Sequence, residues 1–249
     1  MKIFDAHSHI YQKNDILTLK NILKENHDYR LVISATDENS WLDIKNIATD
    51  NKNIFPQFGI HPWFVESRPP LWDIKLKNIL KENERFSIGE SGLDKTNKYK
   101  SSFDIQKKVF IKQLCMAKKM NRPITIHAVK CWGELVEIIK KQEKIRGIIH
   151  SFSGSLEIAN ELIKAGLLLS FSISILNNIS PKTVNLIKEI PINNIVIESD
   201  YITSKKATSI LDTLPNKMEL LIEQIALIKN MELSTVERIL FNNCSELMG

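Results

Sequence analysis

The sequence is poor in the residues that interrupt or cross-link a fold. Only 8 of its 249 residues are glycine and 8 are proline, so long disordered linkers are not expected. Its 3 cysteines, Cys115, Cys131 and Cys244, are odd in number and far apart, which argues against a disulfide framework or a paired-cysteine metal motif. No apolar run approaches the roughly 20 residues that span a bilayer. The opening residues MKIFDAHSHI are typical of a strand, not of a signal peptide. We therefore expect a reduced, cytoplasmic protein with no membrane contact.

Composition and length are those of an ordinary globular protein. Apolar residues make up 43% and charged residues 25% of the sequence. A chain of 249 residues matches one barrel of eight β/α units, so we expect a single domain over residues 1–249. The net charge of +5 is compatible with a polyanionic substrate, but the lysine pairs are scattered and form no basic arm. The sequence leaves the oligomeric state open, and a monomer is the simplest expectation.

Short apolar segments alternate with segments of helical periodicity. The predicted strands are Ile3 to Ala6, Leu31 to Ala35, Ile54 to Gly59, Phe86 to Gly89, Ile124 to Ile126, Ile145 to Ile149, Leu167 to Phe171 and Ile195 to Ile197. The predicted helices are Asp15 to Glu25, Ser40 to Thr49, Leu71 to Asn83, Ser102 to Met120, Trp132 to Lys141, Leu156 to Ala165, Pro181 to Glu189, 215–230 and 234–247. Because the strands are continuously apolar, the pattern favours an α/β fold of the (β/α)8 TIM-barrel type over a doubly wound sheet. Ser180 fits the N-cap before Pro181, and Ser234 with Glu237 fits a capping box.

Histidines and carboxylates stand at the ends of several of these strands. They are His7, His9, Glu90, His127, His150 and Asp200. The carboxyl ends of the strands of a barrel meet at one mouth, so these side chains are expected to converge. His7 and His9 are two residues apart, which places both rings on one side of a strand. Glycines near Glu90 are expected to allow a sharp turn, and Asp5 is a candidate to orient a ligating ring.

Each of these residues, taken alone, has a plainer explanation. His7 and His9 fit a hydrogen-bonded surface pair, and Glu90 fits an exposed turn. His127 and His150 each fit a core histidine with satisfied ring nitrogens, but two in successive strands make that explanation weaker. A carboxylate at position 200 is costly to bury unless it meets a cation or a donor.

Taken together, the residues supply four imidazoles and two carboxylates, enough for two divalent ions bridged by Glu90. The predicted sets are His7, His9, Glu90 and Asp200 for one ion, and Glu90, His127 and His150 for the other. Mixed nitrogen and oxygen ligands suit Zn, Mn, Co or Mg. Two ions about 3.5–4 Å apart hold the attacking and leaving oxygens of a phosphodiester. Asp200 is a candidate general base, so Glu90 and Asp200 are the predicted catalytic pair.

Six motifs resemble, in order, those of the TatD family of metal-dependent deoxyribonucleases, within the amidohydrolase-like barrels. They are DAHSHI, GIHPW, GESGLD, ITIHAVK, IIHSFSG and IESD, between residues 5 and 200. The resemblance implies a two-metal barrel that hydrolyses DNA phosphodiesters, often from a 3′ end, with metal ligands at the six positions named above. It also implies that His61 lies near the substrate phosphate and is not a ligand. The alternative for His61 is a loop histidine held by Pro62.

The chain departs from the family pattern at the loops that shape the substrate site. The family commonly has an arginine two residues after the fifth-strand histidine, whereas His127 is followed by Ala-Val-Lys130. Lys130 fits a phosphate contact or a solvated lysine at a helix start. Lys95 and Lys205 are further candidates to contact phosphates. Trp63 and Phe64 fit either a stacking platform for a base or packing of the loop.

Three classes of function fit the sequence. The first is a metal-dependent deoxyribonuclease acting on ends or flexible single strands of DNA. The second is an amidohydrolase-like enzyme acting on a small phosphoester, amide or lactone. Several such barrels bridge their metals with a modified lysine, so the glutamate at the fourth strand favours the nuclease. The third class, a binding protein on a decayed barrel, is disfavoured by the complete set of candidate ligands.

Overall fold

Eight parallel strands form a closed barrel in the computed structural model, which describes residues 1–249 except 27, 50, 143, 203–210 and 212. The strands follow one another round the barrel in chain order, and β1 pairs with β8 through Asp5 and Ile197. Their bounds are β1 Ile3–Ser8, β2 Tyr29–Ser34, β3 Ile54–Phe58, β4 Ser87–Asp94, β5 Ile124–Val129, β6 Gly147–Ile149, β7 Leu167–Ser172 and β8 Ile195–Glu198. The predicted α/β barrel is therefore confirmed.

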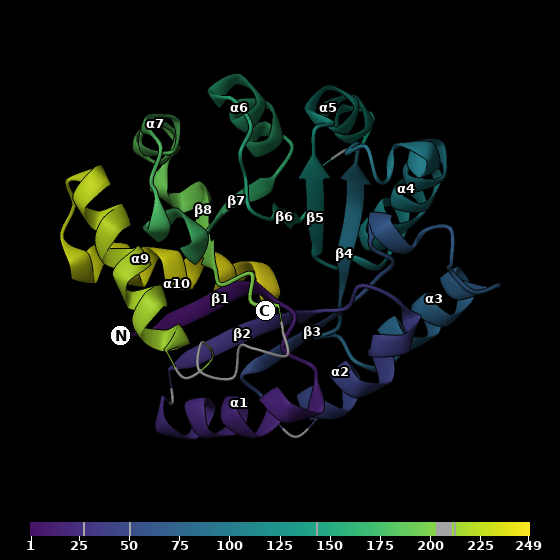
Figure 1. The fold of residues 1–249 in the computed structure, drawn as a ribbon, viewed down its shortest axis with the longest axis horizontal. Coiled ribbons are helices and arrows are strands. Elements are labelled where there is room, and N and C mark those ends of the chain that lie inside the picture. The colour runs from purple at the N-terminus through teal and green to yellow at the C-terminus, as the bar shows by residue number, and fades with distance from the viewer. Residues whose placement is uncertain (27, 50, 143, 203–210, 212) are drawn as a thin grey trace.

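The helices lie around the ring of strands (Figure 1). They are α1 Lys13–Glu25, α2 Trp41–Thr49, α3 Trp72–Glu82, α4 Phe103–Met120, α5 Trp132–Lys140, α6 Leu156–Lys164, α7 Pro181–Glu189, α9 Leu214–Lys229 and α10 Leu233–Met248. The Ser180 side chain accepts a hydrogen bond from the Thr183 amide at the start of α7, as predicted. The predicted capping box at Ser234 is wrong, because α10 begins one residue earlier and its N-cap, Glu232, makes no side-chain capping bond. No described helix is long and apolar enough to cross a membrane.

Two apolar clusters support the barrel. The larger one joins the strands to the surrounding helices. The smaller one combines residues of β1, β2, β3, β6 and β8 with the end of α10, and includes Phe4, Val32, Ile148 and Leu247. Strands on opposite sides of a barrel can share side-chain contacts only through its interior, so this cluster fills the lower part of the barrel, where α10 covers it. The upper part of the barrel is left for polar side chains.

A bulge in β1 directs its histidines into the barrel. The pairing of β1 with β2 shifts by one residue between Asp5 and Ser8. In a regular strand, residues 4 and 7 would face opposite sides. The extra residue lets Phe4 join the inner cluster while His7 and His9 face the mouth above it.

The glycines around Glu90 lie within a strand, where an irregularity in the pairing stands in place of the predicted sharp turn. β4 spans Ser87–Asp94, and its pairing with β5 shifts by one residue between Ile88 and Ser91. A Cβ atom on Gly92 would lie 2.0 Å from the carbonyl oxygen of His127, and one on Gly89 would lie 2.6 Å from Oε1 of Gln57. Glycine is needed at position 92 because the backbone of β5 approaches closely, whereas Gly89 faces the end of the Gln57 side chain.

Candidate metal centre

Glu90 is the common neighbour of five histidines. It is 2% exposed, and its carboxylate oxygens lie within 3.4 Å of a ring nitrogen of each. The distances are His127 Nδ1 to Oε1 2.9 Å, His9 Nε2 to Oε2 3.2 Å, His7 Nε2 to Oε2 3.3 Å, and His61 and His150 Nε2 to Oε1 both 3.4 Å. The predicted convergence of distant imidazoles on one carboxylate is therefore present. An exposed turn at Glu90 is wrong.

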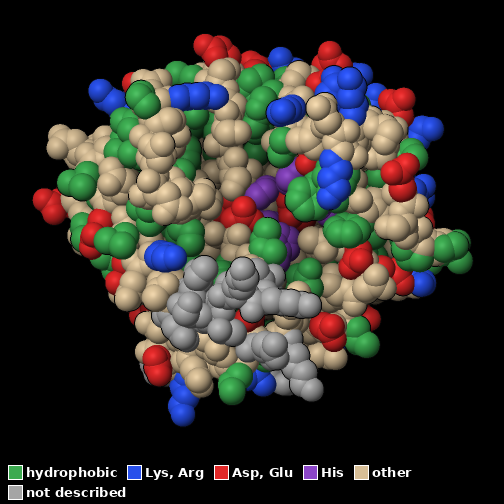
Figure 2. Space-filling model, in the orientation of Figure 1, with side chains coloured by type: hydrophobic (Ala, Val, Ile, Leu, Met, Phe, Trp, Pro, Cys, Tyr) green, Lys and Arg blue, Asp and Glu red, His purple; other side chains and the backbone are tan. Residues whose placement is uncertain are grey.

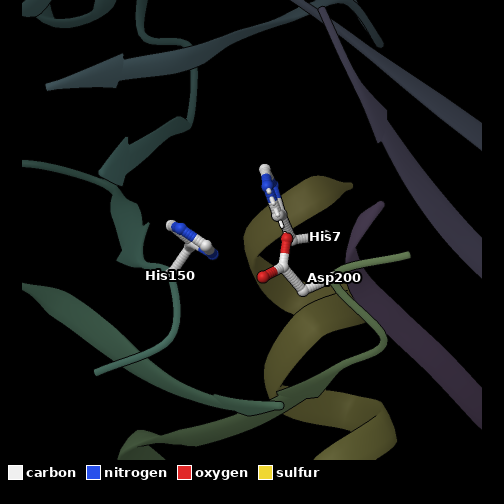
Figure 3. Close-up of side chains that lie close together, drawn as sticks. All are labelled: His7, His150 and Asp200. Atoms are coloured by element: carbon white, nitrogen blue, oxygen red, sulfur yellow. Dashed lines mark ion pairs between the residues drawn. The ribbon is translucent and has the colours of Figure 1, made fainter. Parts of the chain in front are cut away.

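Asp200 lies beside the same cluster at the end of β8. Its Oδ1 is 3.9 Å from Nε2 of His7, and its side chain is 30% exposed (Figure 3). His150 faces this pair from the end of β6. The backbone amide of Asp200 donates to the carbonyl oxygen of His7 at 3.0 Å, so the loop after β8 is tied directly to β1. Asp200 is thus the candidate ligand most open to solvent.

The candidate ligand atoms form three overlapping groups, each within 4.8 Å: His7, His9 and Glu90; His7, His150 and Asp200; and His61, Glu90 and His127. The first group matches the core of one predicted set. Asp200, predicted with His7 and His9, is instead grouped with His7 and His150. His127, predicted with His150, is grouped with Glu90 and His61, although the His127 and His150 rings lie 5.4 Å apart.

Four of the histidines make a polar contact on the side of the ring that faces away from Glu90. In three of them this contact is made by Nδ1. Nδ1 of His9 donates to the carbonyl oxygen of Ser34 at 2.8 Å. Nδ1 of His7 donates to the Ser34 hydroxyl at 3.0 Å, since that hydroxyl donates to Gln57. Nδ1 of His150 donates to Oε1 of Glu198 at 3.1 Å. With Nδ1 bonded in this way, Nε2 of each ring faces Glu90 and can ligate a cation when it carries no proton.

His127 presents its other nitrogen to the centre. Its Nδ1 faces Glu90, while its Nε2 lies 3.3 Å from Oδ2 of Asp94. Asp94 also accepts the Trp63 indole N–H at 2.7 Å and the Thr96 amide at 2.8 Å. Asp94 therefore contacts the His127 ring and also caps the loop after β4.

His61 has the opposite proton arrangement from His7, His9 and His150. Its Nδ1 accepts the backbone N–H of Trp63 at 3.1 Å and so caps the short 3-10 helix η2 (Pro62–Phe64). The ring proton therefore sits on Nε2, which faces Oε1 of Glu90 at 3.4 Å. Burial lowers the pKa of His61 to about 4, against the opposite effect of Glu90, so the ring is neutral. His61 is a hydrogen-bond donor at the cavity, and it can ligate a cation only by giving up its cap.

The charges in the cluster stabilise one another. Burial would raise the pKa of Glu90, but His61, His150 and His7 hold it well below its ordinary range. Burial would also lower the pKa of His150, yet Glu90 and Glu198 raise it to about 10. A proton held this tightly between carboxylates occupies a position where a cation would also be stabilised, and metal binding would displace it.

The donor set fits divalent cations. Within the described part of the chain, Nε2 of His7 is fully buried and has no hydrogen-bond partner, although it points at Glu90 and Asp200. A buried nitrogen lone pair is unfavourable unless it meets a hydrogen-bond donor or a cation. Imidazole nitrogens mixed with carboxylate oxygens suit Zn, Mn, Co or Mg, with imidazole-rich sites favouring the transition metals.

Two residues differ from their sequence-based assignments. Asp5 does not touch a ligating ring, so its predicted orienting function is wrong; its Oδ1 accepts the amides of Ser199 and His7 and joins β8 to β1. Glu198 was missed. It is fully buried and accepts bonds from His150 Nδ1 and from the amide and hydroxyl of Ser151. A charged residue that ends the apolar run Ile195 to Ile197 was the available signal.

A cavity of about 280 Å³ opens above the cluster. Figure 2 shows it as a hollow at the centre of this face, with histidines at the bottom and acidic side chains beside them. Its lining is His9, Tyr11, Thr36, His61, Trp63, Phe64, Glu90, His127, His150, Asp200 and Ile202. Lys130 is exposed in the turn after β5 and is not among these described lining residues. Lys95 is paired with Glu134, and Lys205 lies outside the described residues.

A parallel barrel with buried imidazoles and carboxylates at its carboxyl-terminal mouth defines the class of metal-dependent hydrolases. The family model of TatD related DNases matches residues 4–249, and the chain belongs to this family.

Relatives extend over nearly the whole chain. An uncharacterized metal-dependent hydrolase of Bacillus subtilis, YabD, is 29% identical over 98% of both chains. One of Methanocaldococcus jannaschii is 31% identical over 98% of this chain and 95% of its own. Human deoxyribonuclease TATDN3 is 26% identical over 80% of this chain and 77% of its own. The crystal structure of the Escherichia coli TatD homologue YjjV superposes with a TM-score of 0.86 at 19% identity, covering 99% of this chain and 97% of that one.

Proposed function

We propose that this hydrolase is a deoxyribonuclease that cleaves DNA phosphodiester bonds with two divalent ions. The observation that carries the proposal is the ring of nitrogen atoms around Glu90, in which three histidines are held through Nδ1 and direct Nε2 to the centre. Glu90, His7, His9, His127, His150 and Asp200 would hold the ions. When bound, such ions polarise the phosphoryl oxygens and lower the pKa of an attacking water. The DNase description of the family and the name of the human relative support DNA as the substrate.

The protein's own groups have separate tasks in this proposal. Asp200 is the most exposed carboxylate of the cluster and is placed to accept a proton from the attacking water. His61 offers Nε2–H, which fits donation to a non-bridging phosphate oxygen as negative charge develops there. Lys130, exposed just beyond β5, is proposed to contact a neighbouring phosphate of the strand.

A metal-resolved nuclease assay tests the proposal. Metal-free protein would be supplied in turn with Mg, Mn, Co or Zn and given end-labelled single- and double-stranded DNA. Glu90→Ala and Asp200→Asn should each lower the rate by about 10³-fold or more, because several kcal/mol of charge stabilisation is lost. Glu157→Gln, which removes one negative charge from an exposed helix position, is the matched control and should cleave at the wild-type rate. Wild-type rates in Glu90→Ala would refute the proposal.

The size of the cavity also fits a second function. The cavity of about 280 Å³ is close to the smallest pockets that enclose small molecules, so it can accept a compact phosphoester, amide or lactone. Parallel assays with small phosphoesters and cyclic amides distinguish the two. Metal-dependent turnover of those compounds with no cleavage of oligonucleotides would favour the second function.

A further inference from the structure

A second cavity, of about 370 Å³, lies beside the one above the candidate metal centre. Its walls come from the end of β7, the short 3-10 helix η4 (Ile173–Asn177), the loop after β8 and the start of α9. Among the described lining residues, Asp200 is the one that both cavities share. Asp200 therefore forms part of the wall between them, and a molecule held at the metal centre reaches the second cavity by passing this carboxylate.

The second cavity contains a cation without a charged partner. Lys217 lies in the first turn of α9 and is half-buried where it lines the cavity. It forms no ion pair with any carboxylate of the described residues, and the Asp200 carboxylate on the same cavity is directed to His7 (Figure 3). An ammonium that has lost part of its hydration is stabilised by an anion, so Lys217 favours an anionic ligand here.

The rest of the lining suits a phosphate with a sugar attached. The buried Ser172 hydroxyl accepts the Ser174 amide at 3.2 Å and keeps its own proton for donation. The Asn177 side chain adds a second hydrogen-bonding group, while Leu176 and Leu220 supply apolar surface. The cavity also adjoins the amino-terminal end of α9, where the partial positive charge of the helix favours an anion. Polar groups set in a partly apolar wall are typical of sites that bind small organic ligands.

We propose that the cavity around Lys217 is a subsite for the phosphate next to the scissile one. The substrate strand then lies across Asp200, with one phosphate at the metal centre and its neighbour beside Lys217. The inference rests on the proposed nuclease function and adds a specificity determinant to it. Phosphates recur at every nucleotide of a strand, so a strand bound at the centre always brings a second anion with it.

The subsite distinguishes a nucleic acid from a small substrate. A simple phosphoester has no second phosphate and gains nothing from Lys217, whereas a strand gains the contact at every position where it is cleaved. Lys130 follows β5 and is not among the described residues that line this cavity. The two lysines would therefore contact different phosphates of the strand.

The test compares three thymidine dinucleotides that contain the same phosphodiester bond. One has no terminal phosphate, one has a 5′-phosphate and one has a 3′-phosphate. A terminal phosphate that reaches Lys217 should raise kcat/KM by about 10-fold, because a hydrogen bond between charged groups at a half-buried site contributes more than an exposed ion pair. One of the two terminal phosphates should have this effect, and its identity gives the direction of the strand. Lys217→Ala should remove the gain, and Lys217→Arg should keep most of it.

Lys81→Ala is the matched control. It removes the same charge from an exposed position in the last turn of α3, at the end of the helix away from the barrel mouth, and should keep the gain. Equal kcat/KM for the three dinucleotides in wild type would overturn the subsite. So would a wild-type gain in Lys217→Ala, or equal losses on all three dinucleotides in both Lys217 variants.

A binding measurement separates the subsite from the nuclease function. Thymidine 3′,5′-bisphosphate carries two neighbouring phosphates on one nucleoside, and each thymidine monophosphate carries one. In calorimetric titrations of protein supplied with Mn²⁺, the bisphosphate should bind about 10-fold more tightly than either monophosphate, and Lys217→Ala should remove this difference. Equal affinities in wild type would overturn the subsite. If wild type cleaves none of the dinucleotides, the nuclease proposal fails, and the titration alone then decides whether the Lys217 cavity binds a second phosphate.

Discussion

The histidines of β1 and those of β5 and β6 face the same carboxylate but are held by different chemistry. In what we call the β1 half, His7 and His9 donate to the hydroxyl and the carbonyl oxygen of a single residue, Ser34. In the β5/β6 half, His127 lies against Asp94 and His150 donates to Glu198.

A carboxylate behind an imidazole raises its basicity, whereas a neutral oxygen does so much less. The β5/β6 half is therefore the more electron-rich of the two and is expected to bind its cation more tightly. The comparison teaches that histidines facing one carboxylate can differ in basicity, which a list of histidines does not reveal.

Removing the Glu90 carboxylate should weaken metal binding in both halves, because the histidines of both halves face it. Glu90→Gln keeps the shape but removes the charge that all the rings face, so both positions should lose affinity and DNA cleavage should fall by about 10³-fold or more. Calorimetric titration with Mn²⁺, alongside the nuclease assay, measures both. Retention of one tight site in Glu90→Gln would show that the halves do not share this residue.

Neutralising Glu198, the buried carboxylate beside His150, should weaken metal binding in the β5/β6 half. Glu198→Gln preserves an acceptor for His150 but lowers the basicity of its ring, so affinity at one position should fall by about 10–100-fold while the other is retained. The same titration should then show its tighter step weakened. Equal weakening of both steps would contradict the assignment of Glu198 to one half.

The corresponding change in the β1 half should have a smaller effect. Ser34→Ala removes a neutral hydrogen bond to His7 and keeps the carbonyl oxygen that accepts from His9. A neutral hydrogen bond contributes about 1 kcal/mol, so metal affinity should fall by roughly 5-fold. A loss as large as that of Glu198→Gln would mean that charge behind the ring is not what separates the halves.

The charge on His150 can be tested separately, through the pH dependence of stability in metal-free protein. The pKa of His150 is about 10 in the fold and 6.5 ordinarily, so its stabilising contribution is complete below pH 6.5 and is lost as pH rises through 10. Thermal unfolding with a chelator at pH 6, 8 and 10 should show the melting temperature falling, and falling less in His150→Gln. Parallel curves for the two proteins would contradict a strongly bound proton on His150.

The sequence predicts the barrel and the convergence of histidines and carboxylates at its mouth better than it predicts what surrounds them. The apolar runs before His127 and His150 show where buried strands end, and a polar residue at that place is informative by itself. Ser34 contacts candidate ligands from the neighbouring strand β1, and Glu198 on β8 contacts His150, which follows β6. No spacing along the chain connects either residue to those histidines. The bulge in β1 was equally hidden, because a register shift depends on the partner strand. The glycines of β4 were predicted to form a turn. Gly92 is required by the close approach of β5, which is distant in sequence and cannot be seen from the local residues.

The dependence of two ligands on one serine limits how this centre can change. Any movement of β2 that shifts Ser34 displaces His7 and His9 together, so the two cannot be adjusted one at a time. Asp94 and Glu198 lie on different strands and each acts on one ring. Variation in metal preference among proteins with this arrangement should therefore arise by stepwise substitution at those two carboxylates, while the β1 half stays constant.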